Sequence, residues 1–433
     1  MIVQEKTKDK YAVQSLTFIQ NLLQDYHPRD FTVRLWDGSE WHSESEEPSF
    51  ILVLNHPASL RRMLSDPTSD LAIGEAYIYN DFDIEGDIEA VFPVADYLSH
   101  QDWSLSNRLK LGWELLHLPG KREIDNDERK AAKVSGKTHS IQRDRQAVTY
   151  HYDVSNDFYA LWLDHNMVYS CAYFSDPEED IDTAQERKLD YICRKLRLHP
   201  GERLLDIGCG WGGLIIHAAK YYGVEALGIT LSEPQAELAI QRIQQEGLSN
   251  HCKVEVKDYR EVDDESSFDK LVSVGMFEHV GEALLPTYFK QAWKLLRPGG
   301  AFLNHGIANT ATGPRPKKPT FSNRYVFPDG ELVPINISLH HAEEAGFEVR
   351  DVESLREHYA LTLRNWVKRL ESHHEEALRA VDETTYRVWR LFMAGSAYGF
   401  QTGRLNVYQS LLVKSINGKS YLPLMRKDWY IEE

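Results

Sequence analysis

Four glycines within six residues form the motif Asp206-Ile-Gly208-Cys-Gly210-Trp-Gly212-Gly213, which directly follows a short apolar run. Glycine lets backbone N–H groups come close to a ligand, and the start of a following helix favours a negative group. The spacing also fits G-x-G-x-x-G, the pattern of dinucleotide sites. However, the charge of Asp206, just before the first glycine, would repel a pyrophosphate and suit a cationic amino group.

The segment after the next predicted strand bears on the same choice of ligand. That strand ends in Thr230-Leu231, where a dinucleotide site usually carries an acid that binds a ribose. Glu233 lies about 20 residues past Gly213 and keeps the dinucleotide alternative open. The glycine motif therefore indicates a cofactor site but does not identify the cofactor by itself.

The composition limits the classes of protein that this chain can represent. With 433 residues and 42% hydrophobic residues, it is long enough for one large or two ordinary domains. Its net charge of −17 argues against nucleic-acid binding and against docking on an anionic membrane by charge alone. Four cysteines without a CxxC pair suggest no metal site and a reduced, cytoplasmic setting. Neither a signal peptide nor a transmembrane helix is expected.

Strands and helices are predicted to alternate from about residue 147 onward. This rhythm predicts an α/β fold, a doubly wound and mostly parallel sheet of Rossmann-like type, with ligands at the carboxyl ends of the strands. A helical insertion of about 50 residues, from Ser354 to Arg404, precedes the last predicted strand and is typical of a lid or substrate pocket. Its aromatic residues are interpreted as helix core or as an acyl tunnel: Trp366, Tyr386, Trp389, Phe392, Tyr398 and Phe400.

The chain is predicted to have three parts. Residues 1–104 form a small α+β amino-terminal domain with a hairpin turn at Asp37-Gly38. Residues 105–146 form an amphipathic helix and a basic linker, which holds ten Lys and Arg residues against six Asp and Glu residues. This linker is either a solvated connection or a segment that contacts a lipid surface. Residues 147–433 form the third part, which carries the chemistry.

Several further segments place the glycine motif in a specific context. LDIGCGWGG resembles motif I of the class I S-adenosylmethionine-dependent methyltransferases, and YHYDVSNDFY (150–159) resembles the opening of one such catalytic domain. The whole set resembles the cyclopropane-fatty-acyl-phospholipid synthase family, whose phospholipid-acting members carry a similar amino-terminal extension. The other matching segments are VYSCAYF (168–174), ITLSEPQ (229–235), KDYREV (257–262), SVGMFEHVG (273–281), LNHGI (303–307) and EHYALTLRNW (357–366).

The resemblance implies transfer of a methylene group from S-adenosylmethionine to the cis double bond of an unsaturated phospholipid acyl chain. The products are a cyclopropane ring and S-adenosylhomocysteine. An alkene is a weak nucleophile, so the methyl group must be held close and in line in a dry pocket. Ring closure needs a base, for which the family uses a bound bicarbonate ion. The matching positions are Cys171, Glu278, His305, Tyr359 and, through its backbone, Ile307.

Ten positions match the family's S-adenosylmethionine site: the methionine end, the ribose and the adenine. In chain order they are Tyr169, Ser170, Asp206, Gly208, Gly210, Thr230, Leu231, Gln235, Asp258 and Tyr259. The chain departs from the family at one point, because many members carry a Cys where this sequence has Ser396. That difference weakens any thiol mechanism and leaves a bicarbonate mechanism intact.

The prediction is therefore a cytoplasmic homodimer, peripheral at the inner face of the membrane, that acts on unsaturated phospholipid. One alternative is a fatty-acyl C-methyltransferase that leaves a methyl or methylene branch, since that outcome depends only on which proton is lost. Others are a small-molecule N-methyltransferase, which would not need the amino-terminal domain, and a non-catalytic lipid-binding protein. The amino-terminal domain has dimerisation or stability as an alternative role.

Overall fold

The computed structural model describes residues 9–66, 69–101, 104–120, 131–152, 154–312 and 318–430, without the side chains of Leu105 and Arg108. The chain divides into two compact units. The first comprises Met1–Ala131, Pro316–Val326 and Asp382–Gly395, and the second comprises Ala132–Arg315, Phe327–Val381 and Ser396–Glu433. The boundary near residue 131 lies inside the predicted linker. The division differs from the predicted one because two later segments join the first unit.

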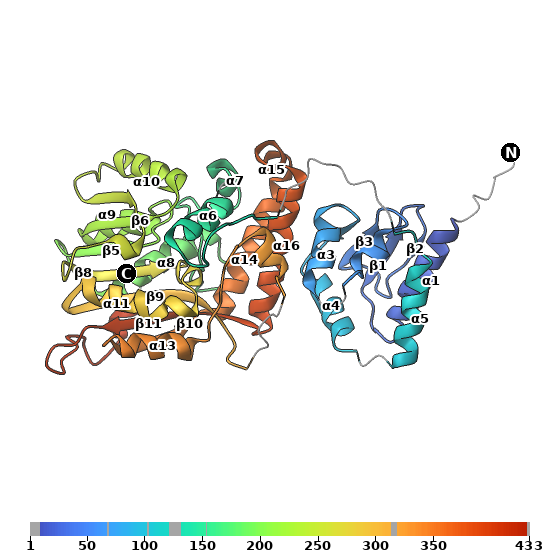
Figure 1. Cartoon of the computed structure of the whole chain (residues 1–433). Coiled ribbons are helices and arrows are strands. Elements are labelled where there is room, and N and C mark those ends of the chain that lie inside the picture. Colours follow the sequence, from blue (N-terminus) through green and yellow to red (C-terminus); the bar gives the residue numbers. More distant parts are fainter. Residues whose placement is uncertain are drawn as a thin grey trace. The chain divides into compact units, whose positions relative to one another are not determined.

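The second unit is built on a seven-stranded sheet in the order β10-β11-β9-β8-β5-β6-β7 (Figure 1). Only β11 runs antiparallel to its neighbours, β9 and β10. The predicted doubly wound, mostly parallel sheet is therefore confirmed. The strands are β5 (Arg203–Ile207), β6 (Glu225–Thr230), β7 (Cys252–Val256), β8 (Phe268–Val274), β9 (Leu296–Asn309), β10 (Glu348–Ser354) and β11 (Leu405–Val413).

Helices cover both faces of this sheet, because successive strand residues alternate between two apolar cores. Leu204 packs with residues of α8 and α9, whereas Leu205 packs with residues of α11 and α13. The helices before the insertion are α6 (Ile141–Tyr152), α7 (Asn156–Ala160), α8 (Ile181–Leu196), α9 (Gly213–Tyr222), α10 (Glu233–Gln245), α11 (Leu285–Leu295) and α13 (Ile335–Glu344).

The predicted helical insertion before the last strand is confirmed. It consists of α14 (Arg356–Ser372), α15 (His374–Ala380) and α16 (Glu383–Gln401). Short 3-10 helices follow several strands of the second unit, among them η1 (Tyr259–Glu261), η2 (Phe277–His279) and η3 (Glu282–Leu284), and η4 (Lys427–Trp429) lies near the end. The 3-10 helices after β7 and β8 therefore contain Tyr259 and Glu278, two of the predicted site residues.

The first unit contains the α+β elements predicted for the amino-terminal domain. Its sheet has the order β2-β1-β3-β4, and β1 and β2 form the predicted hairpin through Asp37-Gly38, where Gly38 has φ +86°. The strands are β1 (Phe31–Leu35), β2 (Glu40–Trp41), β3 (Phe50–Leu54) and β4 (Phe82–Gly86). The helices are α1 (Lys10–Leu22), α2 (Ser59–Met63), α3 (Asp70–Ile78), α4 (Val91–Ser99), α5 (Leu105–Leu116) and α12 (Phe321–Tyr325).

Two buried arginines explain why residues 382–395 belong to the first unit. Arg387 pairs with Asp83, with 2.7 Å between Nη2 and Oδ2. Arg390 donates to the hydroxyl of Tyr77 at 2.8 Å and to the backbone oxygen of Ile84 at 3.1 Å. Three residues of the predicted aromatic group therefore lie in the first unit and not in the second: Tyr386, Trp389 and Phe392.

Helix α5 is the predicted amphipathic helix of the linker. Leu109, Trp113 and Leu116 lie along one side of it and are 68%, 64% and 66% exposed. Residues 121–130 of the basic segment lie outside the described part of the chain. Among the described residues, no helix is both long enough and apolar enough to cross a membrane.

Candidate active site

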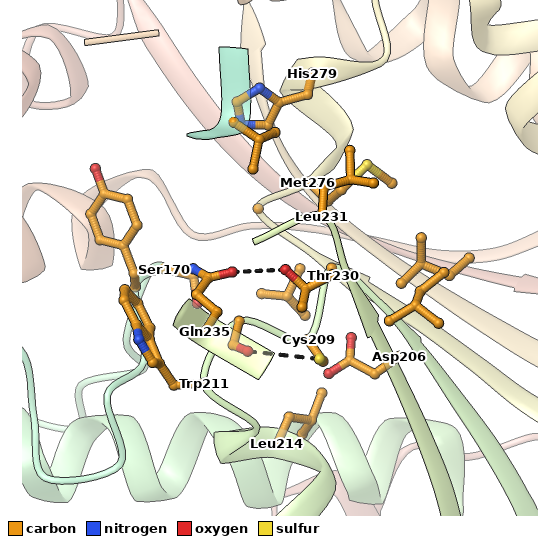
Figure 2. A pocket seen from close by; sticks show the side chains of 18 of the residues that line it. Ser170, Asp206, Cys209, Trp211, Leu214, Thr230, Leu231, Gln235, Met276 and His279 are labelled. Carbon is orange, nitrogen blue, oxygen red and sulfur yellow. Dashed lines mark hydrogen bonds between the residues drawn. The ribbon is translucent and has the colours of Figure 1, made fainter. Parts of the chain in front are cut away.

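A pocket of the second unit lies at the carboxyl ends of β5, β6 and β8 (Figure 2). This is the edge at which parallel α/β sheets bind ligands, because the turns after these strands converge there. All ten residues predicted for the S-adenosylmethionine site line this pocket. They are Tyr169, Ser170, Asp206, Gly208, Gly210, Thr230, Leu231, Gln235, Asp258 and Tyr259.

The glycine motif leaves space for a ligand at the start of α9. Gly208 has φ +89°, and a Cβ atom there would lie 2.7 Å from the Cβ of Met276. Gly210 has φ +54°, and a Cβ atom there would meet no atom of the described residues within 4 Å. Gly212, the N-cap of α9, has φ +81°. The motif therefore forms a close turn at Gly208 and opens toward the pocket at Gly210.

Asp206 provides a buried acidic group in the pocket wall. Its side-chain oxygen Oδ1 has no hydrogen-bond partner among the described residues. Burial raises the pKa of Asp206 to about 7, and the charge of Lys188 acts in the opposite direction. An orphaned carboxylate oxygen suits the cationic amino group of the methionine end of S-adenosylmethionine. The residues present therefore fit this cofactor.

Lys188, on α8, is a pocket residue that the sequence analysis missed. Its Nζ donates to the hydroxyl of Ser170 at 2.9 Å, and burial lowers the pKa of Lys188 to about 8. A sequence signal was present, because Lys188 and Lys195 are seven residues apart and share the buried face of α8 with Ala184 and Ile192. Lysine at core positions of an amphipathic helix indicates a specific buried partner.

Thr230 and Gln235 form a neutral edge of the pocket after β6, as Figure 2 shows. The hydroxyl of Thr230 donates to Oε1 of Gln235 at 2.8 Å, and it accepts from the backbone N–H of Ser232 at 3.2 Å. Gln235 also hydrogen-bonds Tyr152, a further lining residue. In dinucleotide sites an acidic side chain at this position binds the ribose hydroxyl groups. Here β6 ends in Thr230, so the site gives no support to a dinucleotide ligand.

Asp258 and Tyr259 differ in what they can offer a ligand. Both carboxylate oxygens of Asp258 are held by Arg260, at 2.7 Å from Nε and 2.6 Å from Nη2. The hydroxyl of Tyr259 is buried without a hydrogen-bond partner among the described residues. Asp258 therefore organises the turn after β7, whereas Tyr259 keeps a polar atom for the pocket.

The five residues predicted to hold bicarbonate lie close together, but none of them is among the lining residues of this pocket. The backbone N–H of Ile307 donates to Oε1 of Glu278 at 2.6 Å. The pKa of Tyr359 is raised well above its usual value, mainly by burial and also by the nearby Cys171 and Glu278. His305 and Ile307 are two residues apart on β9 and so project from the same face.

Two polar atoms in this group remain unsatisfied. Neither Oε2 of Glu278 nor Nε2 of His305 has a hydrogen-bond partner among the described residues. Burial raises the pKa of Glu278 to about 7, whereas burial and the charges of Lys188 and Lys195 lower the pKa of His305 to about 3. At neutral pH, His305 is therefore an uncharged imidazole, and Glu278 is a carboxyl group that can change its protonation state.

Cys171 contributes a thiol and not a thiolate. It is fully buried, and its Sγ donates to the backbone oxygen of Ala172 at 3.2 Å. Burial raises the pKa of the Cys171 thiol far above neutral pH. The geometry therefore gives no support to covalent chemistry at this residue.

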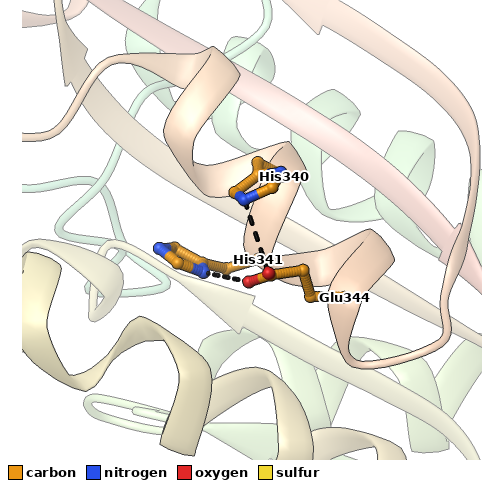
Figure 3. A group of neighbouring side chains, drawn as sticks. All are labelled: His340, His341 and Glu344. Carbon is orange, nitrogen blue, oxygen red and sulfur yellow. Dashed lines mark hydrogen bonds and ion pairs between the residues drawn. The ribbon is translucent and has the colours of Figure 1, made fainter.

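Two clusters of metal-ligand residue types lie elsewhere in the second unit. His340, His341 and Glu344 meet on α13, where both imidazoles pair with the same carboxylate (Figure 3). The other cluster is Asp164, His165 and Asp182. In the second cluster His165 pairs with Asp182, and Asp164 accepts from the backbone N–H groups of Asn166 and Val168. The polar groups of both clusters therefore already have protein partners, and we assign neither a function.

Comparisons with known proteins agree with this geometry. Residues 139–410 match the family model described as mycolic acid cyclopropane synthetase, and residues 18–106 match a domain of unknown function. The chain is 41% identical to a probable fatty acid methyltransferase of Pseudomonas putida, over 92% of this chain and 95% of the relative. It is 34% identical to cyclopropane-fatty-acyl-phospholipid synthase of Escherichia coli, over 70% and 74%.

A solved structure extends the likeness to the cofactor. Mycolic acid cyclopropane synthase CmaA1, complexed with S-adenosylhomocysteine (SAH) and CTAB, has a TM-score of 0.59 at 32% identity, over 62% of this chain and 97% of that chain. The family model alone spans more than half of the sequence. This chain therefore belongs to the mycolic acid cyclopropane synthetase family of S-adenosylmethionine-dependent methyltransferases.

Proposed function

We propose that this protein adds a methylene group to the cis double bond of unsaturated phospholipid acyl chains and closes a cyclopropane ring. The observation that carries the proposal is the pair of unsatisfied buried atoms, Oε2 of Glu278 and Nε2 of His305. In the reaction, the alkene attacks the methyl carbon, the carbon–sulfur bond breaks and a carbocation forms on the acyl chain. Loss of a proton from the added methyl group then lets the ring close.

The side chains of Glu278, His305 and Tyr359 offer the hydrogen-bond donors and the acceptor that a bicarbonate ion needs. S-adenosylmethionine supplies an electrophilic methyl group, and bicarbonate supplies a base that takes up the proton. Ionised Glu278 would accept the single O–H of the anion, while His305 and Tyr359 would donate to its oxygens. One acceptor and two neutral donors match the hydrogen-bonding needs of bicarbonate, and burial keeps water away from the cation.

An aromatic wall beside the pocket supports chemistry through a cation. The ring of Tyr169 lies 5.3 Å from that of Trp366 and 5.5 Å from that of Trp162, measured between centroids. Tyr359 in turn packs against Phe400 at 4.6 Å. Electron-rich ring faces stabilise positive charge and exclude water. These residues would hold the apolar acyl chain beside the methyl group.

The product test uses a host that makes unsaturated phospholipids and no cyclopropane lipids. Expression of the chain is expected to add the mass of one CH2 group to its unsaturated acyl chains, as measured by lipid mass spectrometry. Proton NMR should then show the upfield resonances of a cis-cyclopropane CH2 group. Unchanged acyl masses, with soluble protein that binds S-adenosylmethionine, would contradict the proposal.

A second candidate product has its own support. Two relatives that span most of the chain are described as probable fatty acid methyltransferases. A methyl or methylene branch arises from the same cation when a different proton is lost. In that case the mass gain would be the same, but NMR would show a branch methyl or a vinylidene signal without cyclopropane resonances.

We further propose that α5 brings the enzyme, as a peripheral cytoplasmic protein, to the inner face of the membrane. Three large apolar side chains of α5, those of Leu109, Trp113 and Leu116, are mostly exposed. Their spacing gives one apolar stripe, which is typical of helices that lie in a lipid surface. Homodimerisation, expected from the sequence, stays a prediction.

The double change Trp113→Asp and Leu116→Asp is expected to lower binding to phospholipid vesicles at least tenfold, since burial of each side chain in lipid contributes about 1.5–3 kcal/mol. Vesicle co-sedimentation measures the effect. Tyr221→Asp is the matched control, because Tyr221 is 66% exposed on α9. Equal vesicle binding by the double variant and the wild type would remove α5 from membrane contact.

A further inference from the structure

A row of polar side chains lies behind His305 in the sheet. Glu353 of β10 is the register partner of Gln409 of β11, and Gln409 is the register partner of His305 of β9. Directly paired residues of antiparallel strands project from the same face of a sheet. Gln409 and His305 are 0% and 1% exposed. The row therefore runs from a partly exposed carboxylate to the buried imidazole of the proposed reaction site.

Lys195 of α8 connects the members of this row. Its Nζ donates to Oε1 of Gln409 at 2.9 Å and also binds the carboxylate of Glu353. A second carboxylate oxygen, Oδ2 of Asp351, lies 3.6 Å from Nζ. Tyr191 donates to Glu353 at 2.9 Å, which holds that carboxylate in place. Burial lowers the pKa of Lys195, whereas the two carboxylates act in the opposite direction and favour its charged ammonium form.

The ammonium group fixes the orientation of the Gln409 amide. An ammonium has donors and no acceptor, so the amide atom that faces Lys195 must be the oxygen. The NH2 group of Gln409 then faces Nδ1 of His305, at 3.2 Å. Because the amide donates, Nδ1 must accept and cannot carry a proton. In a neutral imidazole the proton is consequently on Nε2.

We infer that Lys195 and Gln409 are positioning residues that lock His305 in the Nε2–H tautomer. The unsatisfied Nε2 atom then presents a hydrogen-bond donor to the reaction site and cannot act as a base there. The role of that donor rests on the proposed function, in which an oxygen atom of an anion accepts from it. With the other tautomer, the same position would present a lone pair and repel the anion.

Gln409→Glu tests the inference with almost no change of shape. A carboxylate can accept from Lys195 but cannot donate to Nδ1, so in neutral His305 the proton should move to Nδ1. The ring-nitrogen chemical shifts of 15N-histidine-labelled full-length protein report the tautomer, and the signal of His305 is identified by its loss in His305→Gln. At pH above neutral, we expect Nε2–H in the wild type and Nδ1–H in Gln409→Glu.

Two further variants keep the test informative. Gln409→Met removes the donor without adding charge, and we expect a mixture of tautomers. Glu255→Gln is the matched control at an exposed position of β7 outside this row, and we expect the wild-type tautomer and activity. For Gln409→Glu we expect kcat to fall by about 10- to 100-fold, with an unchanged KM for S-adenosylmethionine.

The outcomes separate this inference from the proposed function. A wild-type His305 that carries its proton on Nδ1, or that averages between tautomers, overturns the inference even if cyclopropane lipid is formed. A locked Nε2–H tautomer that reverses in Gln409→Glu supports it even if the lipid product proves to be a different one. A Gln409→Glu variant that reverses the tautomer but keeps full kcat would contradict the catalytic role of the donor.

Discussion

Glu278→Gln is expected to lower turnover by about 10²- to 10⁴-fold, the range typical of lost acid–base groups, while the affinity for S-adenosylmethionine stays nearly constant. The amide oxygen can still accept from the N–H of Ile307, which now bonds Oε1 at 2.6 Å. The NH2 group, however, replaces Oε2, so a buried acceptor becomes a donor. Single-turnover assays on phospholipid, together with calorimetry of cofactor binding, measure the two effects separately.

The pH dependence offers a second test of Glu278. Burial raises its pKa to about 7, so the group is protonated below that pH and ionised above it. If the ionised form orients the base, wild-type activity should rise as the pH increases through about 7. The residual activity of Glu278→Gln should lack this rise. A pH–rate profile of the same shape in both proteins would assign the titration to another group.

Protein stability provides the control for misfolding. A carboxyl whose pKa is raised by folding stabilises the folded state below its unfolded pKa, and this contribution is lost as the pH rises through the folded pKa. Above pH 7, ionising the buried Glu278 destabilises the folded wild type. Glu278→Gln has no group to ionise there, so its melting temperature above pH 7 should not be below that of the wild type. Glu255→Gln, at an exposed position of β7, is the matched variant and should keep full turnover. Turnover of Glu278→Gln within tenfold of the wild type would remove Glu278 from the mechanism.

Gly210→Asn is expected to weaken S-adenosylmethionine binding about 100-fold, because forced overpacking costs about 3 kcal/mol. Gly210 has φ +54°, a left-handed conformation that asparagine adopts more readily than other residues with a side chain. The backbone can therefore keep its shape. A Cβ atom at this position would meet no described atom within 4 Å, so the added amide would enter the space of the cofactor. Isothermal calorimetry with S-adenosylmethionine measures the loss.

Gly247→Asn is the matched control for the glycine motif. Gly247 follows α10, has φ +71° and also leaves open space at its Cβ position, but it does not line the pocket. This variant should bind the cofactor as the wild type does and should unfold at a similar temperature. Equal affinities of Gly210→Asn and Gly247→Asn would show that the cofactor does not lie against Gly210.

The sequence determined the architecture of the second unit and the residues of its pocket. Apolar runs separated by helices predicted the parallel sheet, and the carboxyl ends of parallel strands meet at one edge. Motifs far apart in the chain, such as those at Gly208, Thr230 and Tyr259, therefore had to converge. The segments quoted for the family resemblance selected the same positions, because close approach to a ligand restricts residue type as well as position.

Only the tertiary structure decided which polar groups are free to act. The helical pattern of α8 places Lys188 and Lys195 on its apolar face, but only the packing of α8 on the sheet removes them from water and supplies their partners. Arg260 takes up the carboxylate of Asp258, which the sequence analysis had placed beside the adenine. Arg387 and Arg390 likewise bind residues of β4, in the amino-terminal part of the first unit. In sequence, however, they lie between β10 and β11 of the second unit. Burial and ion pairing depend on partners that are distant in sequence, so no local pattern of residue types could specify them.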